Sequence, residues 1–152
     1  MINKKNIMHF FPFYVIMLVS GGIVFSQSPV LNGKEMPKGI TMYANDIELL
    51  TLFRVSPTIF DEQIKKGNIV PISITDTSVI KKIIQSISEK NRKCETAPID
   101  VRGLLILNYE EQDIKIYYNM SYFLINESIY QMPVKSSYYL DSIRSNWEYG
   151  KH

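Results

Sequence analysis

The segment of residues 99–134 constrains the fold of this chain most, because it contains two hairpin patterns in succession. A mostly apolar run at residues 101–109 is followed by a polar break at residues 110–113 and then by a second run, residues 114–120. In the second run the more apolar side chains recur at every second position, which is the period of a β-strand because successive side chains point to opposite faces. Two such runs joined by a short polar break predict an antiparallel hairpin.

A second hairpin pattern follows directly. Here the short runs of residues 122–125 and 129–132 flank the turn-like residues 126–128. Hairpins in succession predict an antiparallel meander, in which each strand pairs with the next along the chain. We therefore expect an α+β fold whose sheet has about four to six antiparallel strands centred on residues 101–132.

Helical patterns lie on both sides of this meander. In residues 77–90, behind Thr75 or Asp76 as a cap, apolar residues form one stripe at helical spacing: Val79, Ile80, Ile83, Ile84 and Ile87. A second stripe, in residues 137–148, has Ser136 or Ser137 as its cap and Gly150 as its end, and consists of Tyr139, Leu140, Ile143 and Trp147. We expect both helices to pack on one face of the sheet.

Shorter elements precede the first of these helices. Residues 40–43 and 69–74 are β-prone, and Pro71 confines the second run to a sheet edge or to the first residues of a strand. Between them, Ser56, Pro57 and Thr58 predict the start of a short helix over residues 59–66. Its inward side chains are expected to be Ile59, Phe60 and Ile64, and Gly67 is expected to end it.

The N-terminus carries a membrane-directed segment, since Lys4 and Lys5 precede residues 7–25, which hold no charged side chain apart from the titratable His9. The most apolar part, residues 10–19, has the length of a signal-peptide core and is short for the roughly 20 residues that span a bilayer. We favour a cleaved signal peptide over residues 1–26, and a retained anchor over residues 7–25 is the alternative. Either way the body is exported, to a periplasm or the outside, with the lysines on the cytoplasmic side.

After the leader we expect a flexible linker over residues 27–38, rich in Pro, Gly, Ser and Asn, and a single globular domain over residues 39–152. The whole chain has 17 basic and 15 acidic residues, and two of the basic ones are Lys4 and Lys5, so the body is electrically neutral. Nucleic-acid binding needs a concentrated basic surface, which this body lacks. We therefore expect no nucleic-acid partner, and contact with a membrane only through the N-terminal segment.

Histidine and cysteine usage excludes several kinds of chemistry. The two histidines are His9 and His152, so no imidazole lies within the expected elements to act as a base or a metal ligand. The single cysteine, Cys94, excludes an intramolecular disulfide. Ser78 and Lys81 have the spacing of a Ser-x-x-Lys motif, but a helix-capping serine followed by a solvated lysine explains them better. We expect no catalytic residue, metal ligand or cofactor.

Carboxylates leave one enzymatic alternative open. Glu110, Glu111 and Asp113 crowd one expected hairpin tip. A glycosidase needs two carboxylates that face each other across roughly 5–9.5 Å of a cleft, and residues on one exposed tip do not form a cleft. An enzyme that depends on carboxylates or lysine would need a concave site where two such groups converge with shifted pKa values.

The second face of the meander is the candidate interaction surface. The residues expected on it are Tyr117, Lys115, Asn119 and Arg102, and some of Leu104, Ile106, Ile129 or Gln131 join them if the register holds. The candidate site residues among them are Leu104, Ile106, Lys115 and Tyr117. A sheet face open to water should be polar, so this more apolar one must be covered. The cover is a partner protein, a second copy of the chain, or residues 27–55 folded over it. We favour the last, because it needs no second molecule.

For function, we expect an exported, non-enzymatic binding or interaction domain that meets an unknown protein, or a second copy, through this open sheet face. The first alternative is a single-pass, membrane-anchored accessory protein with an extracytoplasmic domain, which differs only in the retention of residues 7–25. The second alternative is a carboxylate- or lysine-dependent enzyme of unknown reaction.

Overall fold

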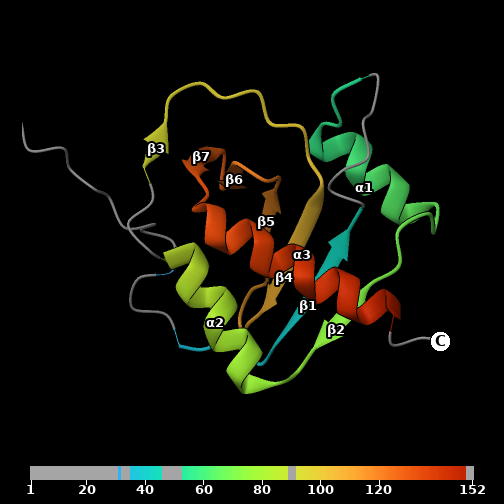
Figure 1. The fold of residues 1–152 in the computed structure, drawn as a ribbon, viewed down its shortest axis with the longest axis vertical. Coiled ribbons are helices and arrows are strands. Elements are labelled where there is room, and N and C mark those ends of the chain that lie inside the picture. Colours follow the sequence, from blue (N-terminus) through green and yellow to red (C-terminus); the bar gives the residue numbers. More distant parts are fainter. Residues whose placement is uncertain (1–30, 32–34, 46–52, 89–91, 150–152) are drawn as a thin grey trace, which may run out of the picture.

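A seven-stranded antiparallel sheet and three helices make up the part of the chain that the computed structural model describes, residues 31, 35–45, 53–88 and 92–149 (Figure 1). The elements in chain order are β1 (Gly39–Ala44), α1 (Pro57–Lys65), β2 (Ile72–Ile74), α2 (Thr77–Ser88), β3 (Lys93–Cys94), β4 (Gly103–Asn108), β5 (Ile114–Tyr118), β6 (Tyr122–Ile125), β7 (Ser128–Gln131) and α3 (Val134–Tyr149). In space, the strand order is β2-β1-β4-β5-β6-β7-β3. The prediction of an α+β fold with an antiparallel sheet is confirmed.

The meander is present, but the expected total of four to six strands is wrong. Strands β4 to β7 each pair with the next along the chain, as predicted. β1 and β2 extend this unit on one side and the two-residue β3 extends it on the other, which brings the described sheet to seven strands. Asn126 and Glu127 close the hairpin between β6 and β7 with positive φ angles of 44° and 64°, as a type I′ turn requires.

Helices α2 and α3 cover one face of the sheet, where they lie side by side in front of the strands in Figure 1. Beneath them, Leu105 of β4 and Ile116 of β5 are almost completely buried. α2 contributes Ile80, Ile83 and Ile87 to this core, and α3 contributes Leu140. The expectation that two helices with these stripes pack on one face is confirmed, and α1 is a third helix that packs on the other face.

The start of α2 follows from its cap. The Oδ1 atom of Asp76 accepts hydrogen bonds from the backbone amides of Ser78 at 2.7 Å and Val79 at 3.2 Å, so Asp76, one of the two residues predicted as the cap, caps the helix. Hydrogen bonds from the Ser78 hydroxyl and from these two amides lower the pKa of the Asp76 carboxyl. The helix is described as far as Ser88, and its expected last residues, 89 and 90, lie outside the described residues.

The start of α3 differs from the prediction. The helix begins at Val134 rather than near Ser137. The carbonyl oxygen of Pro133 accepts hydrogen bonds from the backbone amides of Ser136 at 2.9 Å and of Ser137 at 3.2 Å. Proline therefore precedes the first turn, and both serines lie inside the helix as buried residues instead of capping it. Gly150, the expected end, lies outside the described residues.

α1 forms where the sequence predicted a short helix. At its start, the hydroxyl of Ser56 accepts a hydrogen bond from the backbone amide of Ile59 at 3.3 Å. At its end, Gly67 follows the last turn with a φ angle of 76°. Phe60 faces inward and is completely buried, as expected. The expected inward position of Ile59 is wrong, since this side chain is 44% exposed.

None of the helices that the structure describes is long and apolar enough to cross a bilayer. The expected signal peptide, residues 1–26, and the alternative anchor, residues 7–25, lie outside the described residues. Residues 27–30 and 32–34 of the expected linker also lie outside them.

Gly103 allows β4 and β5 to approach at the end of the pair. It is the cross-strand neighbour of Tyr118, and the phenol ring of Tyr118 lies over it, in the space that a Cβ atom would occupy. Tyr118 itself is almost completely buried. A glycine is therefore required here so that a large ring can fill the core above a strand.

Replacing this glycine tests the close approach. We expect Gly103→Ala to lower the free energy of unfolding by roughly 1–3 kcal/mol, because the methyl group must displace a buried ring in a packed core. Gly39→Ala in β1 is the matched control, since a Cβ atom there would lie 3.5 Å from the carbonyl oxygen of Ile74, an ordinary contact. Urea denaturation followed by circular dichroism measures both, and equal effects of the two substitutions would contradict the role of Gly103.

Candidate interaction surface

α1 covers part of the second sheet face, the one opposite α2 and α3. Phe60 of α1 packs into a cluster with Val101 and Leu104, and Leu104 is 1% exposed as a result. The favoured expectation is that residues 27–55 cover this face, but residues 27–30, 32–34 and 46–52 of this segment lie outside the described residues. Pro57 begins a helix that carries Phe60 over β4, whereas Tyr43 and Val55 pack only at the margin of the cluster.

A polar contact ties α1 to β5. The hydroxyl of Tyr117 donates a hydrogen bond to Oδ2 of Asp61 at 2.9 Å, and Nζ of Lys115 lies 3.5 Å from the same oxygen. Burial, the hydrogen bond and the negative charge of Asp61 together raise the pKa of Tyr117 to about 12. Tyr117 therefore keeps its proton at neutral pH and acts as a hydrogen-bond donor.

Beyond β5 the second face continues over β6, β7 and β3. The strand register sets Tyr117 beside Leu124, Leu124 beside Ile129, and Ile129 beside Cys94, in one row across four strands. All four side chains are half-buried. Leu124 and Ile129 belong to neither of the two hydrophobic clusters in the described part of the chain. We call this area, with Tyr122, Leu124, Ile129 and Gln131 at its centre, the open face.

Two shallow grooves border the open face at opposite ends of its strands. One lies at the turns before β5 and after β6, where Asp113, Lys115 and Glu127 line it together with Leu124. The other lies at the far end, where its lining residues are Arg92, Lys93, Cys94, Glu95, Thr96, Tyr122 and Gln131. Charged residues therefore flank an apolar centre on both sides.

The structure separates the four candidate residues of this face. Leu104 lies under α1, and Ile106 is half-buried beside the same cluster. Tyr117 is at the boundary between α1 and the open face, and Lys115 is exposed and lines a groove. Ile129 and Gln131 lie on this face, as the register required.

Sequence reasoning missed Leu124 and Tyr122. Leu124 is opposite Ile129, and Tyr122 is opposite Gln131. The signal that could have placed them is the two-residue turn at Asn126 and Glu127. A turn of that length fixes which residues of β6 and β7 face each other.

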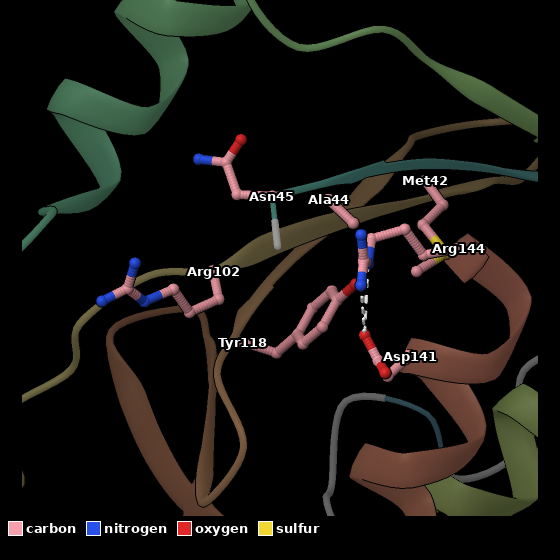
Figure 2. Close-up of a pocket in the computed structure, with 7 residues that line it drawn as sticks. All are labelled: Met42, Ala44, Asn45, Arg102, Tyr118, Asp141 and Arg144. Atoms are coloured by element: carbon pink, nitrogen blue, oxygen red, sulfur yellow. Dashed lines mark hydrogen bonds and ion pairs between the residues drawn. The ribbon is translucent and has the colours of Figure 1, made fainter. Parts of the chain in front are cut away.

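A second polar cluster lies on the helix-covered side, where Figure 2 shows Tyr118 pointing toward Arg144 and Asp141 of α3. Nε and Nη2 of Arg144 both donate to Oδ1 of Asp141 at 3.1 Å. Burial raises the pKa of Tyr118, with Asp141 adding to the shift and Arg144 opposing it. The space between these side chains does not admit a water molecule in this structure, and the cluster lies where α3 meets the sheet.

Two of the groups considered for catalysis make contacts with neighbouring side chains. The hydroxyl of Ser78 donates to Asp76 at 2.6 Å within the cap of α2, and Glu110 at the hairpin tip pairs with Lys38 at 2.7 Å. Asp61 and Lys115 do converge, but they pair with each other. Among the described residues, no three side chains of the metal-binding types lie together.

The contact between Tyr117 and Asp61 predicts a pH-dependent stability. A pKa raised from 10 to about 12 means that the folded state holds this proton more tightly than the unfolded state. The resulting stability is fully present below pH 10 and is lost as the pH rises toward about 12. We expect Tyr117→Phe to lower the free energy of unfolding by about 1 kcal/mol at pH 7. This difference from the native protein should shrink above pH 10.

Urea denaturation at a series of pH values measures this difference. Tyr138→Phe is the control, because Tyr138 is 62% exposed on α3. It should change the stability little at any pH. A Tyr117→Phe effect that stays constant as the pH rises would show that the contact with Asp61 does not cause it.

Comparison with known proteins finds no match for this chain among protein-family models, curated proteins or solved structures. Its function is therefore inferred from the arrangement of its own residues.

Proposed function

We propose that this protein is an exported, non-enzymatic interaction domain that binds a protein partner through the open face. The observation that carries the proposal is the row of side chains that leaves the cover of α1 at Tyr117 and continues to Leu124 and Ile129. An apolar row on a sheet face is stabilised when a second surface removes it from water. A half-buried tyrosine such as Tyr122 suits such contacts, since tyrosines bury a large area at small entropic cost.

The dimensions of the elements explain why this area stays open. Seven strands spaced about 4.8 Å apart make a sheet roughly 30 Å wide. α1 has nine residues, and at about 1.5 Å per residue it is roughly 13 Å long. A helix of this size covers only part of a face that wide.

The sheet edges offer a poorer binding site than the face. β2 has three residues and β3 has two, so neither edge presents a long row of free backbone groups to an added strand. Pro71 directly precedes β2, and Lys93 in β3 is exposed. Short edges with proline and lysine are typical of sheets that avoid pairing edge to edge.

Two further features support the non-enzymatic and exported parts of the proposal. Tyr117, with its raised pKa, stays protonated, and Asp61 and Lys115 neutralise each other beside it. The leader with Lys4 and Lys5 followed by an uncharged apolar run supports export. In the alternative with a retained anchor over residues 7–25, the same domain would bind its partner at the membrane surface. The mass of the mature protein distinguishes the two alternatives.

Site-specific photo-crosslinking tests the proposal. We expect a photoreactive amino acid in place of Leu124 to give a discrete covalent adduct in cells that produce the protein, because the open face contacts a partner. The same group in place of Tyr138, an exposed position on α3, is the control and should give none. If no adduct forms at position 124, or if the same products form at both positions, the proposal is contradicted.

A further inference from the structure

We infer that the protein partner of the open face presents a Lys or Arg side chain next to apolar ones, an inference that rests on the proposed function of that face. The groove at the turns before β5 and after β6 carries the charge that such a partner meets. Asp113 and Glu127 line it, and both are exposed. Lys115 lines it too, but its ammonium group pairs with Asp61 of α1 at 3.5 Å. Three carboxylates and one ammonium group therefore leave two negative charges at this end of the face.

The same groove has an apolar floor. Ile106, Tyr117 and Leu124 line it, and all three are half-buried. Lys and Arg side chains match a groove of this kind, because their aliphatic stems pack on apolar surface while the charged head remains at the rim. With its stem on Leu124, a basic side chain brings its head to the carboxylates of Asp113 and Glu127. Hydrogen bonds between such a head and a carboxylate are stronger than those between neutral groups.

The row of the open face places the rest of the partner. Leu124 lies in the groove and is also the strand neighbour of Ile129. Apolar side chains that follow the basic one along the partner can therefore cover Leu124 and Ile129 together. Burial of this row supplies the hydrophobic part of the binding free energy, and the acidic end sets which way the partner lies.

The far groove explains why a different protein fits better than a second copy of the chain. Arg92 and Glu95 bring one charge of each sign to its lining. Lys93 is opposite Tyr130 in the strand register, and Tyr130 is buried in the core beneath α2 and α3, so Lys93 belongs to the other face. The open face, as far as the structure describes it, is thus charged at its acidic end only. A second copy would bring the same acidic groove without a basic end to meet it.

Selection from a phage-displayed library of random peptides tests this chemistry, with the full chain as cells process it. We expect the peptides that bind to be enriched in Lys or Arg next to large apolar residues. The affinity of a synthetic peptide made from this selection should fall as salt is added. Glu127→Lys should raise the dissociation constant of that peptide roughly tenfold, because like charges then face each other. Replacing the basic residue of the peptide with Glu should restore binding to the variant.

The controls separate binding from folding. Glu127 is exposed, so the Glu127→Lys variant should keep the native melting temperature. Glu35→Lys makes the same change of charge at another exposed position, which lines a different groove beside the hairpin tip. It should leave the dissociation constant of the peptide unchanged.

The outcomes also separate this inference from the proposed function. A selection that gives no binders, binders without a basic residue, or a charge exchange that does not restore binding would overturn the inference. If the crosslink from position 124 still forms in cells and is unchanged by Glu127→Lys, the interaction domain stands and its partner needs no basic group. An adduct with the mass of two copies of the chain likewise overturns the inference alone. If there are neither binding peptides nor a crosslink, both the inference and the proposed function fail.

Discussion

Packing of β4 against β5 is the interaction on which the rest of the structure depends, because β4 is apolar on both of its faces. Leu105 and Leu107 point toward α2 and α3, and Leu104 and Ile106 point the opposite way, toward α1. Burying an aliphatic side chain of this size contributes about 1.5–3 kcal/mol. A strand of this composition is stable only between two layers of packed side chains. Among the described helices, α2 and α3 cover one face of the sheet and α1 covers part of the other.

The helices cover the two faces of the sheet to different extents. Across the face beneath α2 and α3, the buried core reaches from β2 to β7. On the other face the cluster around Phe60 reaches β5 and ends at Tyr117. The hydrogen bond from Tyr117 to Asp61 lies at this boundary, and it fixes α1 over β4 and β5 while leaving β6 and β7 outside the cluster. The same packing that completes the core thus leaves the area to which we assign binding.

Much of this fold could be predicted because the spacing of the apolar residues agrees with the turn and cap residues that separate the elements. The meander follows from alternation between polar breaks, and α2 follows from one apolar stripe behind Asp76. The two-residue β3 could not be predicted, since such a short strand has no pattern of its own. The position of α1 could not be predicted either, because the spacing of Phe60 and Ile64 shows which helix face is apolar but not which sheet face it meets.

The residues of the last two strands could not be assigned to a sheet face from the sequence for a similar reason. Side chains alternate across a strand, so an uncertainty of one residue in a turn moves every side chain of the following strand to the other face. The sequence therefore missed Leu124, whereas Leu104 lies on the expected face and is buried because α1 packs over it. It is the turn at Asn126 and Glu127 that sets Leu124 beside Ile129.

Native-state hydrogen exchange tests most directly the claim that the doubly covered pair β4 and β5 is the centre of the fold. Amides of central residues such as Leu105 and Ile116 should exchange only through global unfolding, with a free energy equal to that from urea denaturation. Amides of β7, which has helix cover on one face only, should open at a lower free energy. Exchange of the β4 and β5 amides through local opening while β7 remains protected would contradict the account.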